Sequence, residues 1–233
     1  STSPANLLFV GILTMPLKFE RRSLIRMTYL RLKPPTVTVA FVICLPGTPE
    51  AARLIALEQS FHRDILVLNC TENMDNGKTY SYFSTVGAPG FSFAGISRWD
   101  YVMKTDDDVF IMLPNIADKL ADKPREGFFF GRKVSGFMAG LGYVLSWDLV
   151  EWIARDPFPK NDRIGQEDYK TAGWLAKSHL VKHWVSEDNE IYDEPSSGKG
   201  WAHPYTPDTL IVHRMKASDA FLTGAMHFVG SAF

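Results

Sequence analysis

The chain has 233 residues, of which 45% are hydrophobic, so it is long enough to form one large domain around a sizeable core. Its formal net charge is −1 and it has no long basic block, which argues against nonspecific nucleic-acid binding. No apolar run approaches the length that spans a bilayer, and no signal peptide is visible. The chain opens on Ser1 without a Met, so we expect a trimmed form of a longer protein.

Short apolar runs alternate with helical patterns through the first half of the chain. We expect strands at residues 7–13, 37–44, 65–69 and 101–104, and helices at 19–30, 50–61 and 78–86. Alternating strands and helices predict an α/β fold with a mainly parallel sheet that is covered on both faces. Right-handed crossovers then bring the carboxyl ends of the strands, and any ligand site, to one edge of the sheet.

Two cysteines, Cys44 and Cys70, each follow one of these apolar runs. If the two strands are neighbours, the thiols lie side by side, and a disulfide would suit an oxidising compartment. Two buried free thiols are equally compatible with the pattern. Asn69 formally begins a glycosylation sequon, but it adjoins a predicted buried strand, so we do not expect a glycan there.

The second half of the chain is less regular. We expect helices at 114–121, 147–155 and 167–177, the second of them capped by Ser146, and short strands at 127–131, 142–145, 180–184 and 209–213. Residues 186–207 are rich in Gly, Ser, Pro and charge, which predicts a long irregular loop. No linker is visible, so we expect a single domain over residues 1–233.

Three carboxylates, Asp106, Asp107 and Asp108, stand between two short apolar runs. Carboxylates at a strand end are costly to desolvate unless positive charge meets them. Their oxygens suit Mg²⁺ and Mn²⁺, so one interpretation is a divalent metal that holds a diphosphate. An Asp-x-Asp pair arises about once by chance in a chain of this composition, and a solvated turn or helix cap fits the spacing equally well.

Three further candidates lie at the ends of predicted elements. Glu167 and Asp168 begin a helix, where acids are stabilised by the helix dipole. The pair is an ordinary capping sequence or presents a general base into a pocket. His213 ends a short apolar run, and it is either a packed histidine or the nitrogen ligand of a mixed Mn²⁺ site.

Arginines and glycines mark two more positions. Arg21, Arg22 and Arg26 follow the first strand, either on a solvated helix face or at a site for phosphate or uracil. Small residues within 137–146 allow a ligand to approach the backbone closely, or they form a tight turn packed on a sheet.

Taken in order, these segments resemble the family-31 glycosyltransferases, which include β-1,3-galactosyltransferases, β-1,3-N-acetylglucosaminyltransferases and Fringe-like enzymes. Residues 19–26 resemble the opening "ERRxxIRxTW", with Tyr29 in place of Trp, and 104–110 resemble "KxDDDVF". Weaker similarities cover the "DIL" strand at 64–66, the "NLTxKT" segment near 76–79, the tail of "CSGGGYVLS" at 140–146, with Leu141 replacing a Gly, and the acidic pair of "EDVxxG" at 167–168. Apart from the loose match near 76–79, five motifs in a fixed order make the resemblance specific.

The resemblance implies a GT-A fold with a mixed, mostly parallel central sheet flanked by helices. Residues 1–110 would form the nucleotide-binding half and 111–233 the acceptor-binding half. It implies an inverting, metal-dependent transfer of a hexose from a UDP-sugar to a hydroxyl of a glycan or glycoprotein, with Mn²⁺ or Mg²⁺ as cofactor. Galactose in a β-1,3 linkage is the expected product, with N-acetylglucosamine as the alternative sugar. The expected location is the Golgi lumen, as the catalytic domain of a type II membrane protein engaged in protein glycosylation, whose anchor is absent from this chain.

The resemblance also assigns roles to individual residues. Asp106, Asp108 and His213 would hold the metal, and Asp107 would contact the donor ribose or sugar. Asp168 would be the catalytic base, with Glu167 as second choice. The residues expected near the UDP are Thr14, Arg21, Arg26, Lys78, Asp106 and Asp107. We also expect the loop at 186–207, which carries Trp201, to close over the donor and exclude water.

The chain is shorter than typical family members and lacks most cysteines of the animal examples, which resembles a more divergent branch such as a fungal one. Two other functions remain open on the sequence. A metal-dependent phosphohydrolase is opposed by the presence of a single acidic cluster, because two-metal hydrolases spread their ligands over several loops. A lectin-like module or a degenerate transferase is opposed by the intact set Asp106–Asp108, Asp168 and His213.

Overall fold

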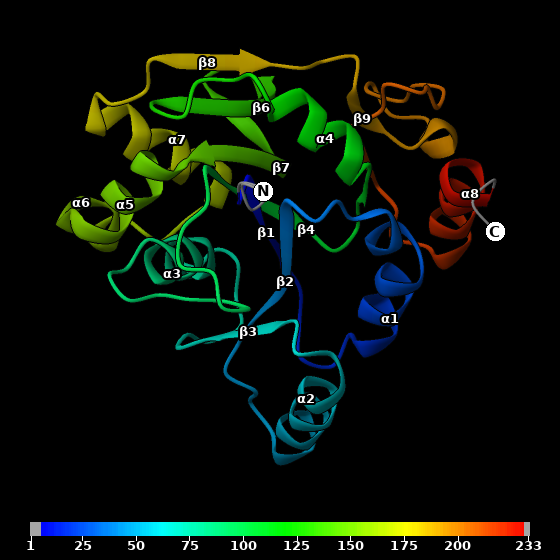
Figure 1. Cartoon of the computed structure of the whole chain (residues 1–233), viewed down its shortest axis with the longest axis horizontal. Helices are drawn as coiled ribbons and strands as arrows, with labels where there is room; N and C mark the ends of the chain where they lie inside the picture. The colour runs from blue at the N-terminus through cyan, green and yellow to red at the C-terminus, as the bar shows by residue number, and fades with distance from the viewer. Residues whose placement is uncertain (1–5, 231–233) are drawn as a thin grey trace, which may run out of the picture.

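The computed structural model describes residues 6–230 and centres on a seven-stranded sheet of order β3-β2-β1-β4-β7-β6-β8 (Figure 1). Its strands are β1 (Leu8–Leu13), β2 (Val37–Cys44), β3 (Ile65–Leu68), β4 (Tyr101–Asp106), β6 (Phe128–Val134), β7 (Phe137–Ser146) and β8 (His183–Ser186). β1 pairs in parallel with β2 and β4, and β2–β3 and β6–β8 are also parallel, whereas β7 runs antiparallel to β4 and β6. The predicted α/β fold with a mixed, mostly parallel sheet is therefore confirmed.

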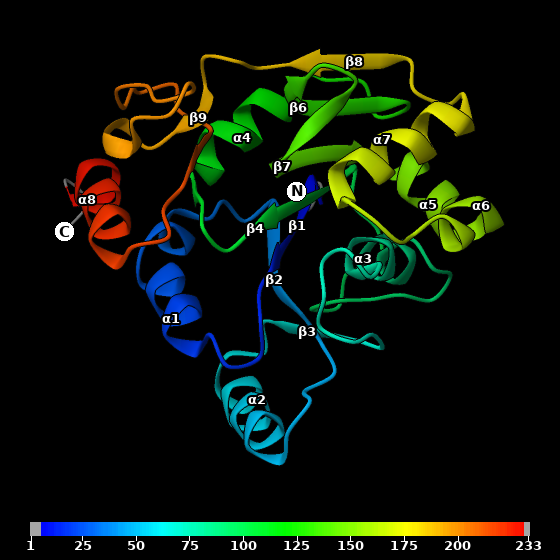
Figure 2. The same ribbon diagram turned by 180° about the vertical axis from the view of Figure 1, so that it is seen from behind.

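Helices cover both faces of this sheet (Figure 2). One face carries α1 (Phe19–Met27), the 3₁₀ turn η1 (Tyr29–Leu32), α2 (Pro49–His62), α4 (Leu113–Leu120) and α8 (Ser218–Val229). The other carries α3 (Lys78–Val86), α5 (Trp147–Arg155) and α7 (Glu167–Ser178), and the short α6 (Pro157–Asn161) lies beside α7. Alternate side chains of β1, such as Phe9 and Val10, enter the two separate cores. Within residues 6–230, no helix is both long enough and apolar enough to cross a bilayer.

Gly11 allows β1 and α3 to approach each other closely. A Cβ at this position would lie 2.3 Å from the Tyr82 ring, so any larger residue would push the helix away. The Tyr82 hydroxyl passes β1 and donates a hydrogen bond of 2.9 Å to the carbonyl of Met103 in β4. α3 is thereby held over the strand ends that carry the candidate site.

A second, three-stranded sheet brings the C-terminal part of the chain next to the residues that follow β4. It consists of β5 (Phe110–Ile111), β9 (Ile191–Asp193) and β10 (Ile211–His213), with β10 antiparallel to β5 and parallel to β9. The prediction of an irregular loop at 186–207 is wrong in part, because Ile191 and Tyr192 are buried strand residues and Pro195–Ser197 form a 3₁₀ turn. Trp201 lies against the guanidinium of Arg132, and no residue of 186–207 lines the main cleft.

The second half differs from the sequence prediction in one helix cap and in two additional helices. Ser146 precedes α5, but its hydroxyl accepts a hydrogen bond of 2.9 Å from the amide of Phe128 and does not cap the helix. The expected helix ends at Arg155, and a further helix, α6, begins directly at Pro157 and is capped by Asp156, which accepts from the amide of Phe158 at 2.8 Å. α8 lies outside the predicted elements, although its buried Phe221, Ala225 and Val229 recur at helical spacing.

Candidate active site

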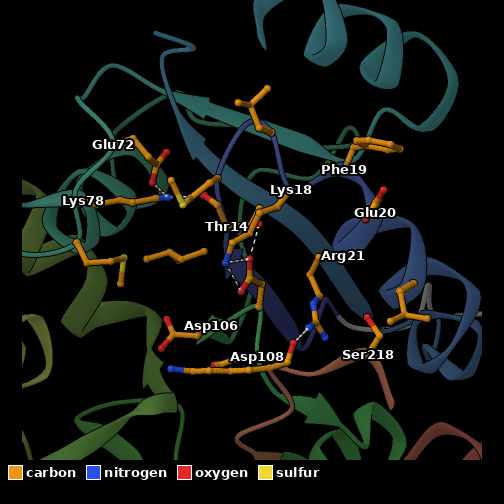
Figure 3. A pocket seen from close by; sticks show the side chains of 17 residues that line it. Thr14, Lys18, Phe19, Glu20, Arg21, Glu72, Lys78, Asp106, Asp108 and Ser218 are labelled. Atoms are coloured by element: carbon orange, nitrogen blue, oxygen red, sulfur yellow. Dashed lines mark hydrogen bonds and ion pairs between the residues drawn. The ribbon is translucent and has the colours of Figure 1, made fainter. Parts of the chain in front are cut away.

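A cleft of about 840 Å³ opens at the carboxyl ends of β1 and β4 (Figure 3). Its volume lies in the range of small-molecule sites. The register pairs Leu13 with Asp106, so the residues that follow the two strands converge there. The predicted site residues that line the cleft are Thr14, Arg21, Lys78, Asp106, Asp107 and Asp108.

Asp107 is used inside the protein. The hydroxyl of Thr14 donates to Asp107 Oδ2 at 2.6 Å, and Lys18 Nζ lies 3.1 Å from both carboxylate oxygens. The carboxylate is almost fully buried. Asp107 therefore fixes the segment between β1 and α1. Asp106 and Asp108 line the same cleft, and in the described chain neither forms an ion pair with that segment.

Arg22 holds the same segment from behind. Its buried guanidinium donates to the carbonyls of Met15 at 2.6 Å and Pro16 at 2.8 Å, and it forms a two-pronged ion pair with Glu58. Neither sequence interpretation of Arg22, a solvated face or a phosphate site, is correct. The pairing of two buried side chains 36 residues apart leaves no local pattern in the sequence.

Arg26 is the predicted UDP-binding residue that the structure does not bring to the cleft. Its guanidinium pairs with both oxygens of Asp64 at 2.8 Å and with Glu58 at 2.7 Å, and it lies over the ring of Phe41. These contacts hold the guanidinium beside the C-terminal end of α2, away from the cleft. The position of Arg26 therefore does not support a role in UDP binding.

Lys78 and Glu72 form the opposite wall of the cleft. The nearly fully buried Lys78 ammonium donates to the carbonyl of Thr14 and pairs with Glu72. Burial lowers the pKa of Lys78, against the opposing pull of Glu72 and Asp107. Glu72 also accepts a hydrogen bond of 3.0 Å from the amide of Cys44, which forms a disulfide with Cys70. The alternative left open by the sequence is thus resolved in favour of the disulfide, which anchors this wall.

His213 faces Asp108 across a short gap. Its Nε2 lies 3.9 Å from Asp108 Oδ2, and its Nδ1 lies 2.8 Å from Oδ1 of the buried Asp193. A carboxylate that accepts from one ring nitrogen orients the other nitrogen as a metal ligand. Asp193 was not among the predicted site residues, because it lies in the segment expected to be irregular. Arg214 holds its second oxygen at 2.9 Å.

The residues at this gap fit a divalent ion. Asp108 Oδ1 is buried without a hydrogen-bond partner in the described chain, and burial raises the pKa of this carboxyl although His213 opposes the shift. Two ligand atoms 3.9 Å apart can share an ion whose ligand distances are roughly 2.1 Å. Over residues 6–230 no three His, Cys, Asp or Glu side chains are grouped closely enough to hold an ion alone. An ion here therefore needs further oxygen ligands, which a diphosphate carries.

Lys104 connects this region to the start of α7. The fully buried ammonium donates to Glu167 Oε1 and the carbonyl of Gly140, both at 2.6 Å, and pairs with Asp106 Oδ1 at 2.9 Å. Although burial alone would lower it, the two carboxylates raise the pKa of Lys104. Glu167 Oε2 also accepts from the hydroxyl of Tyr143 at 3.1 Å. Glu167 is therefore engaged in internal contacts and does not suit the second-choice role of base.

Asp168 is differently placed. It is half-buried, its Oδ1 accepts from the amide of Tyr169 at 2.8 Å, and it forms no ion pair with any residue of 6–230. A Cβ at Gly140 would lie 3.5 Å from Asp168 Oδ2, 3.6 Å from Lys104 Nζ and 2.7 Å from Glu167 Oε1. Gly140 is thus closely packed against Glu167, and its bare backbone lets the carboxylates of Glu167 and Asp168 and the ammonium of Lys104 come together at the start of α7.

This arrangement, a mostly parallel sheet with a cleft at the carboxyl ends of its strands and an acidic strand end in the cleft, is the GT-A fold of solved glycosyltransferases. The galactosyltransferase LgtC, solved with donor and acceptor sugar analogues, superimposes with a TM-score of 0.53 at 12% identity and covers 96% of this chain and 95% of its own. The glycosyltransferase GlyE of Streptococcus pneumoniae TIGR4 gives a TM-score of 0.53 at 12% identity, over 93% of this chain and 56% of GlyE. At these identities the similarity concerns the fold.

The chain belongs to the galactosyltransferase family, because residues 20–136 match the family model described as Galactosyltransferase. The β-1,3-galactosyltransferase pvg3 of Schizosaccharomyces pombe is 25% identical over 90% of this chain and 71% of pvg3. Mouse β-1,3-galactosyltransferase 1 is 25% identical over 63% of this chain and 53% of the enzyme. The Xenopus tropicalis UDP-GalNAc:β-1,3-N-acetylgalactosaminyltransferase 2 is 25% identical over 51% of this chain and 28% of its own length. The resemblance seen in the sequence is confirmed, and the chain matches only about half or less of the two animal relatives.

Proposed function

We propose that the protein is an inverting hexosyltransferase that moves galactose from UDP-galactose to a hydroxyl of a glycan acceptor and forms a β-1,3 linkage. The observation that carries the proposal is that two separate acidic groups lie near one cleft. Asp108 and His213 face each other at the cleft, and Asp168 stands unpaired beyond the Lys104–Asp106 contact. The names of the pvg3 and mouse relatives support galactose and the β-1,3 linkage.

In this proposal the nucleotide half, residues 1–110, holds the donor. A divalent ion, Mn²⁺ or Mg²⁺, would bind between Asp108 and His213 and supply positive charge to the diphosphate. Asp106, held by Lys104, would stand beside it. Arg21 lines the cleft, and its buried Nη1 has no hydrogen-bond partner in the described chain, so it is available to an anionic or carbonyl oxygen of the UDP.

The chemical step assigned to this chain is a proton transfer. Asp168 accepts the proton of the acceptor hydroxyl as its oxygen attacks the anomeric carbon. The bond between that carbon and the phosphate oxygen breaks, and its electron pair leaves with UDP. Attack from the face opposite UDP inverts the configuration and requires no covalent intermediate with the protein. Residues 111–233, which carry Asp168, would form most of the acceptor half.

We further propose that this domain acts in the Golgi lumen, attached to an anchor outside this chain, in protein glycosylation. The Cys44–Cys70 disulfide suits an oxidising compartment of that kind. The first test is calorimetric titration of UDP into the protein with Mn²⁺ and again with a chelator. Binding that depends on Mn²⁺ supports a nucleotide-sugar transferase, and absence of binding in both conditions contradicts it.

A second assay separates the possible reactions. UDP-galactose, UDP-N-acetylglucosamine and UDP-N-acetylgalactosamine are each incubated with the protein and a panel of glycan acceptors, and the disaccharide linkage is determined. A β-1,3-galactoside is the expected product. Preference for UDP-N-acetylglucosamine would assign the alternative donor. Release of inorganic phosphate without sugar transfer would indicate a phosphohydrolase, and sugar binding without turnover would indicate a lectin-like domain.

A further inference from the structure

Lys216 has a backbone that is fixed at the mouth of the cleft. The guanidinium of Arg21 in α1 donates a hydrogen bond to the carbonyl of Lys216. The amide of the preceding residue, Met215, donates to the carbonyl of Asp108 at 2.8 Å. Figure 3 shows Arg21 and Asp108 among the side chains that line the cleft. The short segment between β10 and α8 is therefore tied both to α1 and to the acidic end of β4.

The side chain of Lys216, by contrast, is loosely held. It is 78% exposed, and Nζ lies 3.9 Å from Asp108 Oδ2, which is beyond hydrogen-bond distance. Within residues 6–230 this is its closest ion pair. Each of the other cations of the cleft already makes a contact, since Lys18 pairs with Asp107 at 3.1 Å, Lys78 pairs with Glu72, and one nitrogen of Arg21 donates to the carbonyl of Lys216. Lys216 is the cleft cation that can reorient without breaking a hydrogen bond.

The charge of the cleft creates a need for such a cation. Its lining contains five acidic side chains, Glu20, Glu72, Asp106, Asp107 and Asp108, and four basic ones, Lys18, Arg21, Lys78 and Lys216, which leaves a net charge of −1. A nucleoside diphosphate brings further negative charge, and repulsion from Asp106 and Asp108 would weaken its binding unless cations meet it. Lys216 stands beside Asp108, one of these carboxylates, and can add its charge to that of the proposed divalent ion.

We infer that Lys216 contacts the outer phosphate of the bound nucleoside diphosphate. The inference rests on the proposed function and deepens it. The anomeric carbon must face Asp168, which lies beyond Lys104 and Asp106, so the phosphate that bears the sugar lies at the Asp106–Asp108 end of the cleft. When the sugar–oxygen bond breaks, the electron pair remains on an oxygen of that phosphate, and the ammonium of Lys216 stabilises the added charge.

The test compares two nucleotides that differ by one phosphate. UDP and UMP are titrated calorimetrically, with Mn²⁺ present, into the wild-type protein and into the variants Lys216→Ala and Lys216→Arg. We expect Lys216→Ala to bind UDP about tenfold more weakly and UMP within about twofold of wild type, because only UDP carries the outer phosphate. Lys216→Arg keeps the charge and recovers most of the UDP affinity. Lys182→Ala, at an exposed lysine directly before the edge strand β8, is the matched control and leaves both affinities unchanged.

Each result decides between distinct conclusions. Because the Lys216 side chain is largely exposed, its removal leaves the fold intact, and an unchanged melting temperature checks this. Wild-type binding of UDP together with an unchanged Lys216→Ala would overturn the inference and leave the proposed function standing. Equal losses for UDP and UMP would also overturn it, because the effect would not depend on the outer phosphate. No binding of UDP by the wild type would overturn the proposed function and the inference with it.

Discussion

The buried ammonium of Lys104 donates to Glu167 Oε1 over 2.6 Å, and this contact gives two adjacent acids different surroundings. Glu167 is held by Lys104 and by the hydroxyl of Tyr143, and burial raises the pKa of its carboxyl although Lys104 opposes the shift. Asp168, one residue later, forms no ion pair within the described residues, and its Oδ2 would lie 3.5 Å from a Cβ at Gly140. A buried lysine thus docks the start of α7 on β4 and leaves the next carboxylate available as a base.

The first prediction separates these two acids. Asp168→Asn removes the base without changing shape, so we expect kcat for transfer to fall by at least about 100-fold, with Mn²⁺-dependent UDP affinity within about twofold of wild type. Glu167→Gln leaves Lys104 with one carboxylate partner, so we expect a loss of about 1–3 kcal/mol in the free energy of unfolding. Initial rates, calorimetry and urea unfolding measure these quantities. Full transfer activity in Asp168→Asn would exclude Asp168 as the base.

The second prediction concerns the carboxylate behind His213. Asp193 Oδ1 lies 2.8 Å from His213 Nδ1, so Asp193→Asn should loosen the orientation of the imidazole and weaken Mn²⁺ binding by about 10- to 100-fold. Titration of Mn²⁺ into the protein in the presence of UDP measures the change directly. Asp188→Asn, at an exposed site in the same region, is the control and should leave the affinity unchanged. Equal Mn²⁺ affinity in wild type and Asp193→Asn would remove His213 from the metal site.

The first half of the fold follows closely from its sequence pattern, because each of its elements carries its own signal. Continuous apolar runs give the parallel strands, and the observed β2 (Val37–Cys44) and α3 (Lys78–Val86) have the expected bounds. Later elements depend on distant partners. β9 is a three-residue strand that pairs with β10, twenty residues further on, and its sequence alone does not distinguish it from a loop.

The candidate site divides in the same way. The acidic run Asp106–Asp108 and the pair at 167–168 are visible in the sequence because their residues are adjacent. Lys104, Asp193 and Lys216 obtain their roles from partners between 20 and 108 residues away, and a single sequence gives no measure of those distances. Arg26 shows the reverse error, because a residue in a recognisable motif is engaged by Glu58 and Asp64.

The third prediction is a pH dependence of stability that arises from Glu58. Burial would raise the pKa of this carboxyl, but its hydrogen bonds and ion pairs with Arg22 and Arg26 outweigh that effect and hold the pKa below its usual range. A lowered pKa in the folded state stabilises the protein above the unfolded value of about 4.3, and the contribution is lost as the pH falls through the folded value. Glu58→Gln should cost about 2–4 kcal/mol at pH 7.

Urea unfolding of wild type and Glu58→Gln at a series of pH values from 7 to about 3 tests this. The difference between their free energies of unfolding should shrink once the pH drops below about 4.3. The exposed Glu126→Gln is the control and should differ little from wild type at any pH. A difference that stays constant down to pH 3 would show that the charge of Glu58 is not what stabilises the Arg22 contacts.

The fourth prediction concerns the disulfide behind the cleft wall. Cys44 and Cys70 enclose a loop with a sequence separation of 26, so the double variant Cys44→Ser/Cys70→Ser should lose about 3 kcal/mol in the free energy of unfolding. Glu72, two residues after Cys70, accepts from the amide of Cys44 and pairs with Lys78. We therefore also expect UDP affinity to fall several-fold in the double variant and in the reduced wild type. Unchanged affinity in both would show that the wall holds without the disulfide.

The last prediction tests the close packing of Gly140 against the start of α7. Gly140→Ala introduces a Cβ 2.7 Å from Glu167 Oε1, closer than real Cβ atoms come, so the carboxylate of Glu167, next to Asp168, must move. Displacement of the base by a fraction of an ångström should lower kcat for transfer by about 10- to 100-fold and leave UDP affinity nearly unchanged, because Gly140 does not line the donor cleft. Gly173→Ala is the matched control, since a Cβ there meets nothing within 4 Å and alanine favours the helix. If Gly140→Ala transfers sugar as fast as wild type, the packing at Gly140 does not position Asp168, and the position assigned to the base would have to be revised.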